Sequence, residues 1–341
     1  MKPVLRAARR RLRRLRRPPA RAIVLLYHSI SEAAFDPWDL CVRPEDFAAH
    51  LDILSRRAHV LSLSDLLTHL ERGALPKRAV AITFDDGYVD NLHIARPLLQ
   101  RHGMPATVFV TAGLIGSDRS FWWDELVQLT LAPVALPRVV RLVIAGRPFS
   151  FTLGADAKRD ATSEVYRSWR FDGAPPTRRH ALCRALWQRL QPLKDAERGQ
   201  ILADLRAQAQ LDADVSTLRI MSEAELQQLA AGGLIEMGAH TLTHPVLARL
   251  STAEQRVEIA GGKAELERIL GTPVCSFSYP HGGRADFTPS TVQAVRDAGF
   301  QCACTTTEDW VRPSANRYRL PRVHVPPASA AVFEELLDFW L

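Results

Sequence analysis

Two stretches far apart in the 341-residue chain carry side chains that could act on one metal ion. Asp85 and Asp86 follow the apolar run 80–84, and His240 and His244 lie four residues apart. Adjacent carboxylates occur in solvated turns, but they repel each other, and a bound cation relieves that repulsion. Two imidazoles and one carboxylate leave coordination positions open for water, as in hydrolytic metal sites. The pattern therefore predicts a divalent metal site, and the imidazoles favour Zn²⁺.

The runs that lead to these residues have the pattern of buried strands. Residues 22–28, 80–84 and 234–238 are short and mostly apolar, and segments with helical periodicity separate them. This alternation predicts an α/β fold with a parallel sheet, whose strands share one carboxyl edge. His28 ends the first of these strands. It either faces a site at that edge or bonds a backbone carbonyl as a structural residue.

Three segments together resemble the motifs of a known family. Residues 83–87 (Thr-Phe-Asp-Asp-Gly) resemble the first motif of the polysaccharide deacetylases, the family with the NodB homology domain. Residues 240–245 are similar to the second motif, and residues 278–282 to the third, an aromatic-proline segment. The resemblance covers roughly residues 22–325, apart from a poorly matched stretch in the middle. It implies a distorted (β/α) barrel of about seven strands.

The resemblance also implies roles for individual residues. Asp85 is expected to be the general base, and Asp86 is expected to bind the metal together with the two histidines. A cation lowers the pKa of its bound water, and Asp85 would take the proton. At the Tyr279 and Pro280 segment, the backbone N–H of Tyr279 is expected to bind the oxyanion.

Two departures from the family pattern concern the base and the general acid. Many members carry an arginine shortly before the third motif, and here Arg322 is the expected substitute from another strand. Members often use a Leu-x-His motif for the general acid, but this chain has a longer spacing in residues 320–324. His324, His28 and His281 are therefore rival acids, with His28 or His324 preferred. If Arg322 points inward, the period-two alternation of a strand also sends His324 inward.

The basic character of the chain is concentrated at its start. The formal net charge is +7, but residues 1–21 contain ten basic and no acidic side chains. The remaining 34 basic and 37 acidic residues give residues 22–341 a net charge of −3. The tail is expected either to lie as a helix on an anionic membrane surface or to be a solvated extension. No aromatic residues interleave with its arginines, so nucleic-acid binding is not expected. It lacks the apolar core of a secretory signal, which predicts a cytoplasmic protein, peripheral at the inner membrane face if the tail binds lipid.

Residues 120–220 interrupt the strand–helix rhythm. A hairpin pattern is followed by helical stretches rich in Arg, Ala, Leu and Gln, which predicts a mainly helical insertion packed beside the barrel. It could cover the cleft or select the substrate. Trp122, Trp123 and Trp169 could stack on sugar rings, but placement in the core is the favoured interpretation.

The leading hypothesis is a metal-dependent hydrolase that removes N-acetyl groups from amino sugars of a polysaccharide or its lipid-linked precursor. One alternative is hydrolysis of another non-peptide C–N bond, such as a cyclic amide, on the same fold. The other is a carbohydrate-binding protein without catalytic activity. The altered third motif and the missing Leu-x-His motif favour the binding protein mildly. The intact Asp-Asp and His-x-x-x-His sets argue more strongly for the enzyme, because a binding protein has no need of adjacent carboxylates.

Overall fold

The computed structural model describes residues 20–117, 119–158, 167–211 and 218–341. Except for residues 20 and 21, the basic tail predicted from the sequence lies outside the described residues. No described helix combines the length and the apolar character needed to cross a membrane.

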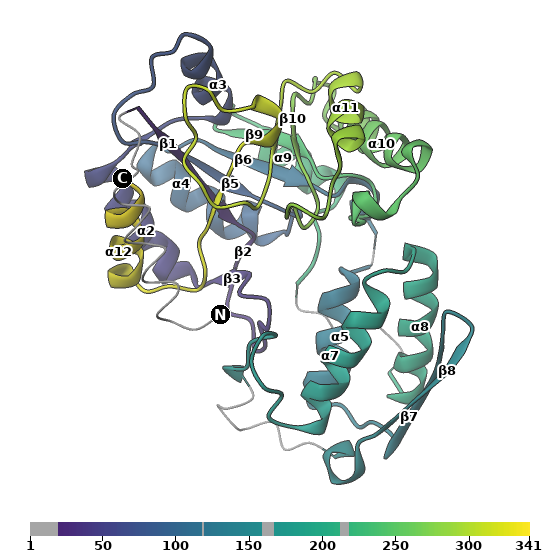
Figure 1. The fold of residues 1–341 in the computed structure, drawn as a ribbon. Helices are drawn as coiled ribbons and strands as arrows, with labels where there is room; N and C mark the ends of the chain where they lie inside the picture. The colour runs from purple at the N-terminus through teal and green to yellow at the C-terminus, as the bar shows by residue number, and fades with distance from the viewer. Residues whose placement is uncertain (1–19, 118, 159–166, 212–217) are drawn as a thin grey trace.

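Parallel strands form a strongly curled sheet in the order β11-β10-β9-β6-β5-β1-β12 (Figure 1). The strands are β1 (Ala22–Tyr27), β5 (Ala79–Phe84), β6 (Ala106–Val110), β9 (Ile235–Ala239), β10 (Ser276–Ser278), β11 (Cys302–Cys304) and β12 (Val323–His324). A further short strand, β4 (His59–Val60), pairs with β5. The pair β2 (Ser29–Ile30) and β3 (Cys41–Val42) lies outside this sheet.

The segment around β12 closes the gap between the two edges of the curled sheet. Val323 pairs with Leu25 of β1. The N–H of Leu320 donates to the carbonyl of Ala303 beside β11, and the Leu320 carbonyl accepts from Thr305, both at 2.8 Å. The distorted (β/α) barrel of about seven strands that was predicted from the sequence is confirmed.

Side chains alternate between the two faces of the strands, as the pleat of a strand requires. Ile23 and Leu25 belong to the large outer core beneath the helices. Ala22 and Val24 belong to a smaller cluster with Phe109, to which β11 also contributes. This alternation decides which residues at the carboxyl ends of the strands point into the barrel.

Helices cover the outside of the barrel (Figure 1). They are α2 (Pro44–Arg57), α3 (Leu63–Glu71), α4 (Arg96–His102), α9 (Glu223–Ala230), α10 (Thr252–Leu270), α11 (Pro289–Asp297) and α12 (Ala330–Trp340). Short helical turns are η1 (Asn91–Ala95), η2 (Ala112–Leu114), η4 (Leu247–Arg249) and η5 (Arg317–Arg319). Serine or threonine side chains cap several of these helices; Ser251, for example, accepts the N–H of Glu254 at the start of α10.

The described part of residues 120–220 packs as a separate layer beside the barrel (Figure 1). Its elements are α5 (Trp122–Leu131), the hairpin β7 (Val139–Ile144) and β8 (Arg147–Thr152), η3 (Gly154–Ala157), α7 (Arg178–Leu190) and α8 (Asp195–Gln208). It has its own apolar cluster. Trp122, Trp123 and Trp169 are 5%, 6% and 6% exposed, so all three are buried, as the core interpretation requires.

Candidate active site

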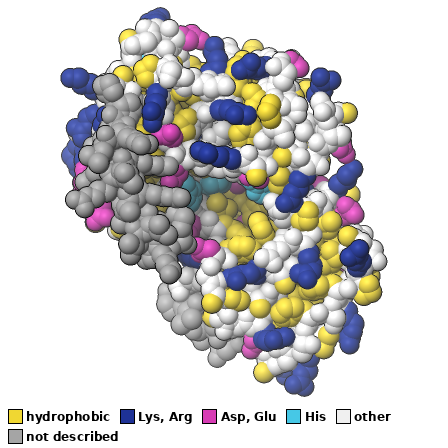
Figure 2. Space-filling view, in the orientation of Figure 1, with side chains coloured by type: hydrophobic (Ala, Val, Ile, Leu, Met, Phe, Trp, Pro, Cys, Tyr) yellow, Lys and Arg dark blue, Asp and Glu magenta, His cyan; other side chains and the backbone are white. Residues whose placement is uncertain are grey.

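Asp86, His240 and His244 meet at the carboxyl ends of β5 and β9. One ligand atom from each residue lies within 4.8 Å of the others. The Nε2 atoms of His240 and His244 are 3.6 and 3.5 Å from Oδ1 of Asp86. Figure 2 shows histidine side chains at the floor of a hollow in the surface. The three residues whose sequence spacing suggested a metal site therefore come together in the fold.

The polar atoms of this cluster have the arrangement that a metal ion needs. Oδ1 of Asp86 is buried and has no hydrogen-bond partner among the described residues. His240 Nδ1 lies 2.8 Å from the carbonyl oxygen of Ser278, which can only accept, so Nδ1 carries the proton. This bond leaves the lone pair of Nε2 directed at the cluster, as in metal-binding histidines.

The electrostatics of the cluster also favour a cation. Burial raises the pKa of Asp86 well above its usual value, and the neighbouring Asp85 and Asp124 raise it further. Burial lowers the pKa values of His240 and His244, which keeps both imidazoles neutral. A bound cation would stabilise the ionised form of Asp86 and requires neutral imidazoles. The residues present therefore fit a divalent metal ion.

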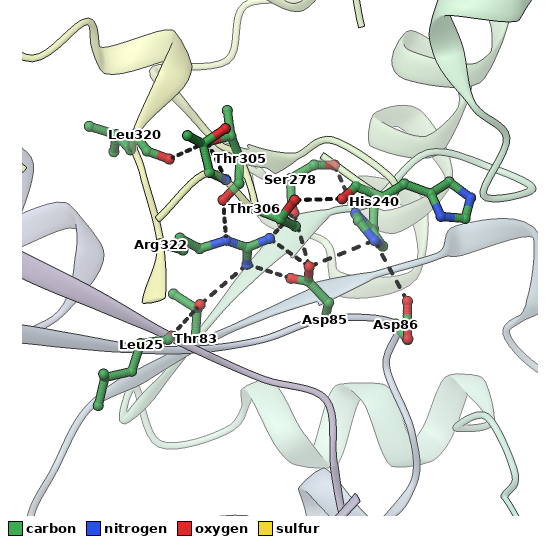
Figure 3. A network of polar contacts seen from close by, with 12 residues as sticks. Leu25, Thr83, Asp85, Asp86, His240, Ser278, Thr305, Thr306, Leu320 and Arg322 are labelled. Atoms are coloured by element: carbon green, nitrogen blue, oxygen red, sulfur yellow. Dashed lines mark hydrogen bonds and ion pairs between the residues drawn. The ribbon is translucent and has the colours of Figure 1, made fainter. Parts of the chain in front are cut away.

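Asp85 has a different environment from its neighbour. Arg322 donates from Nη1 to Oδ1 at 2.7 Å and from Nη2 to Oδ2 at 2.6 Å, a bidentate pair (Figure 3). The Ser278 hydroxyl donates to Oδ2 at 3.2 Å. Burial raises the pKa of Asp85, but the charge of Arg322 and its hydrogen bonds outweigh burial and lower it to about 2. Asp85 is therefore ionised at neutral pH.

Arg322 is fully buried and held from several directions. Its Nε donates to the carbonyl of Thr305 at 3.0 Å, and its Nη1 donates to the hydroxyl of Thr83 at 3.3 Å (Figure 3). Its Nη2 also donates to the Ser278 hydroxyl at 2.7 Å. The structure places this arginine against Asp85, the position expected for the substitute of the missing family arginine.

The three rival histidines occupy different positions. Asp85, Asp86, His240 and His244 line one cavity, named the catalytic cavity. His28 and His281 also line it, but His324 does not. The ring of His324 lies 6.0 Å from that of His28 and bonds the backbone of Asp39. Val323 belongs to the outer core, so alternation turns Arg322 and His324 inward together, as the coupled prediction required. Of the two preferred acids, His28 lines the cavity and His324 does not.

His28 combines cavity access with an unused ring nitrogen. Its Nδ1 is buried without a hydrogen-bond partner among the described residues. The side chain of Asn91 donates to the His28 carbonyl at 2.9 Å, which fixes the turn after β1. Burial lowers the pKa of His28 to about 3, against the opposing effect of Asp85, so its imidazole is neutral in the free site.

The oxyanion role predicted for Tyr279 needs a correction. Its N–H donates to the carbonyl of Cys304 at 3.1 Å, continuing the ladder between β10 and β11. Neither Tyr279 nor Pro280 lines the cavity, and the tyrosine ring stacks on Phe287. The next residue but one, His281, lines the cavity, and its backbone N–H has no partner among the described residues.

Several site residues share an unusual backbone conformation. Four of the non-glycine residues with a φ angle in the left-handed region, which disfavours residues with a Cβ atom, belong to the site segments. They are Asp86 (78°), Thr241 (67°), His244 (56°) and His281 (60°). Such conformations persist where the surrounding structure imposes them, and they cluster at functional sites.

Comparison with known proteins agrees with this geometry. The family model for polysaccharide deacetylases matches residues 72–136 and 204–303, which contain both metal-site motifs and leave most of the insertion unmatched. The family model and the curated relatives support the polysaccharide deacetylase family for this chain.

The curated relatives match part of the chain. YxkH of Bacillus subtilis, itself assigned to the polysaccharide deacetylases, is 37% identical over 113 residues, which are 33% of this chain and 39% of that protein. The poly-β-1,6-N-acetyl-D-glucosamine N-deacetylase of Staphylococcus aureus is 29% identical over 110 residues, 28% of this chain and 38% of that protein. The match thus spans less than two fifths of either relative's length.

Solved structures share the fold over nearly the whole chain. The Streptococcus pyogenes deacetylase PplD, solved with acetate, has a TM-score of 0.57 at 18% identity and covers 95% of this chain and 100% of its own. IcaB of Ammonifex degensii has a TM-score of 0.58 at 19% identity, covering 94% and 97%. These likenesses show the fold of the polysaccharide deacetylase family.

Residues 240–245 form the loop that carries both histidines, named the candidate metal loop. A residue that the sequence motifs did not indicate holds this loop in place. The carboxylate of Glu258 on α10 accepts the N–H groups of Leu242 and Thr243 at 3.0 and 2.9 Å, and the Thr243 hydroxyl at 2.7 Å. A Cβ atom on Gly262 would lie 2.8 Å from the backbone of Thr241. The glycine pair 261–262 inside a helix was the available signal, because glycine there marks close packing.

Aromatic rings form one wall of the cavity above the metal cluster. Trp38, Trp123 and Trp187 line this space of about 150 Å³. The ring centroids of Trp38 and Trp187 are 5.4 Å apart, although one belongs to a barrel loop and the other to α7 of the insertion. Trp123 serves both the insertion core and the cavity, and it packs 4.7 Å from the ring of His244. No motif indicated Trp38 or Trp187, because their approach depends on tertiary packing.

Proposed function

We propose that this protein is a metal-dependent hydrolase that removes N-acetyl groups from amino sugars of a polysaccharide. The observation that carries the proposal is the convergence of Asp86, His240 and His244 beside an Asp85 that Arg322 keeps ionised. Without a cation, Oδ1 of Asp86 would stay buried and without a hydrogen bond among the described residues.

The three ligands are proposed to hold a divalent cation, and the two imidazoles favour Zn²⁺. Such an ion, when bound, lowers the pKa of water and polarises an acetyl carbonyl. Asp86 supplies the negative charge of the ligand set, and Ser278 fixes the ring of His240 in the binding orientation.

Asp85 is suited to accept the proton of the attacking water. It lies beside the ligand cluster, since its Oδ2 is 3.9 Å from Nε2 of His240. Arg322 and Ser278 fix both carboxylate oxygens, so the base does not need to reorient before it accepts the proton.

Proton delivery to the leaving amine is assigned to His28. It lines the cavity and has a free Nδ1, and it is neutral in the absence of substrate. Negative charge that develops on the acetyl oxygen raises the proton affinity of a nearby imidazole, so His28 takes up a proton from solvent. His28 then gives this proton to the amine nitrogen as the C–N bond breaks, while Asp85 holds the proton of the attacking water. The backbone N–H of His281 is proposed, in place of that of Tyr279, to stabilise this oxygen.

The tryptophan wall supports a sugar substrate. Trp38, Trp123 and Trp187 offer apolar ring faces beside the reacting groups, and aromatic faces pack against the C–H face of sugar rings. The Staphylococcus aureus relative is named for poly-β-1,6-N-acetyl-D-glucosamine. We therefore infer a glycan with N-acetylglucosamine units as the substrate class.

The test is acetate release from poly-β-1,6-N-acetylglucosamine and from chito-oligosaccharides. Activity should be abolished by a chelator, restored by Zn²⁺, and absent in His240→Ala. His59→Ala is a matched control, because His59 is an exposed histidine outside the site. The control should retain wild-type rates.

Three outcomes would contradict the proposal. Acetate release that persists without metal would remove the role of the cluster. Binding of both glycans with no acetate release under any metal would favour a carbohydrate-binding protein, and turnover of a cyclic amide alone would favour the other C–N hydrolase.

A further inference from the structure

A groove of about 550 Å³ lies where the insertion meets the barrel. Residues 191–195 and the start of α8 form one wall, and α10 with the candidate metal loop forms the other. Thr243 and Pro245 line this groove, whereas His244 between them lines the catalytic cavity. The groove and the cavity therefore share one loop.

Arg198 of α8 lines the groove and is 2% exposed. Its guanidinium lies over the ring of Trp122, at 5.3 Å from the ring centroid. Its Nε is buried without a hydrogen-bond partner, and no ion pair or side-chain hydrogen bond joins it to any residue in the described parts of the chain. A buried arginine normally has its charge paired.

The acidic residues around the groove already have partners. Asp195 pairs with Arg119 at 3.0 Å, and Glu254 pairs with Lys194 at 2.9 Å. Glu258 holds the candidate metal loop with both carboxylate oxygens. None of these carboxylates lies within bonding distance of the buried guanidinium.

The location of Arg198 is also unfavourable for a cation. It lies near the amino end of the 14-residue helix α8, where the helix dipole favours negative charge. Burial lowers the pKa of Arg198, and the nearby carboxylates of Asp195 and Glu258 offset this effect only in part. Arg249 adds a second, exposed guanidinium at the same groove, with no ion pair among the described residues. An anion in the groove would relieve all of these conditions.

We propose that this groove is a subsite for an anionic group, phosphate or carboxylate, carried by the glycan, and that Arg198 is its binding residue. That the anionic group belongs to a glycan rests on the proposed function. That Arg198 binds an anion does not. The two sites lie near each other, because Trp122 beneath Arg198 packs 5.7 Å from Trp123 of the cavity wall.

Thermal unfolding with added anions tests the subsite directly. Inorganic phosphate and glucuronate should each be titrated, with neutral N-acetylglucosamine as the reference. The anion that raises the unfolding temperature at the lower concentration identifies the group as phosphate or carboxylate. In Arg198→Met, which keeps the packing on Trp122, the Kd of the preferred anion should rise about tenfold or more. Without anion, this variant should be at least as stable as the wild type, because an unpaired buried charge is removed.

Arg198→Lys should keep most of the anion response, since it keeps the charge, and it covers the case in which the methionine variant does not fold. Arg56→Met removes an exposed arginine of α2 and should behave as the wild type. Equal anion responses in the wild type and Arg198→Met, or no response in the wild type, would overturn the subsite.

Glycan turnover separates this proposal from the proposed function. The KM for oligosaccharides that carry the preferred anion should rise more in Arg198→Met than the KM for neutral ones. Anion binding that needs Arg198 without any acetate release would leave the subsite standing and reject the deacetylase. Acetate release together with anion binding that is unchanged in Arg198→Met would support the deacetylase and reject the subsite.

Discussion

The barrel and the insertion contribute different kinds of groups to the cavity and to the groove beside it. In the barrel, charged residues follow directly after strands and are fixed by several bonds; Asp85, for example, is held by Arg322 and Ser278. The insertion contributes rings and one unpaired guanidinium on helices, represented by Trp187 and Arg198.

This difference indicates a division between chemistry and selection. Groups that exchange protons or hold a metal need fixed positions, because small displacements reduce rates strongly. Groups that recognise a glycan act through the apolar contact area and the charge that they present to it. Substitutions in the barrel should therefore lower kcat, and substitutions in the insertion should mainly raise KM.

The largest effect is expected for Asp85→Asn. This change removes the proposed proton acceptor, so kcat should fall by about 10²–10⁴-fold in an acetate-release assay. The metal ligands remain, and metal content should stay at the wild-type level. Loss of both the metal and the activity would instead show that Asp85 binds the metal, as Asp86 is proposed to do.

Arg322→Met should produce the largest change in stability. It leaves the buried charge of Asp85 without its partner, which should lower the free energy of unfolding by about 3–5 kcal/mol. Chemical denaturation measures this loss. The double variant with Asp85→Asn should recover most of it, and a double variant as unstable as Arg322→Met would contradict the pairing argument.

Trp187→Ala tests the insertion side of the comparison. Removing one ring of the wall should raise KM for the glycan by about three- to tenfold, with a smaller change in kcat. Phe151→Ala, on the hairpin away from the cavity, is the control. A fall in kcat without a rise in KM would show that the insertion takes part in the chemistry.

The smallest expected effect is the contribution of His50 to the loss of barrel stability at low pH. His50 lies against Phe333 of α12, and its Nε2 bonds the carbonyl of Ala328 at 2.8 Å. Burial lowers its pKa to about 4, so the unfolded chain takes up this proton first as the pH falls. Its contribution to stability is therefore complete above about pH 6.5 and declines towards pH 4.

Urea unfolding at pH 7 and pH 5 measures that contribution. His50→Gln should remove about 1–2 kcal/mol of the difference in unfolding free energy between these two pH values. The variant His59→Ala is the control, because its side chain is exposed. An unchanged difference in His50→Gln would mean that other buried groups account for the acid sensitivity.

Much of the barrel side could be predicted from the sequence because its signals are local. Short apolar runs ending in Asp85 and His240 predicted strands that deliver both to one edge, and strand alternation predicted the shared direction of Arg322 and His324. Alternation along a strand predicts the face to which a side chain points, but not whether the side chain reaches the cavity. His324 therefore points inward and still lies outside the cavity lining.

The remaining features depend on contacts between distant segments. The N–H of Tyr279 is engaged by Cys304, and that bond depends on the register between two strands. The approach of Trp38 to Trp187 depends on how the insertion packs against the barrel. Arg198 has no ion pair among the described residues because the acidic residues around the groove bind other partners. No sequence motif indicates those pairings.

The most direct test of the central claim is the metal content of the purified protein. The account predicts about one equivalent of a divalent ion per chain in the wild type and in Asp85→Asn. It predicts loss of that ion in His240→Ala and in Asp86→Asn. A wild-type protein that binds no divalent ion after incubation with Zn²⁺, or a His240→Ala variant that keeps a full equivalent, would contradict it.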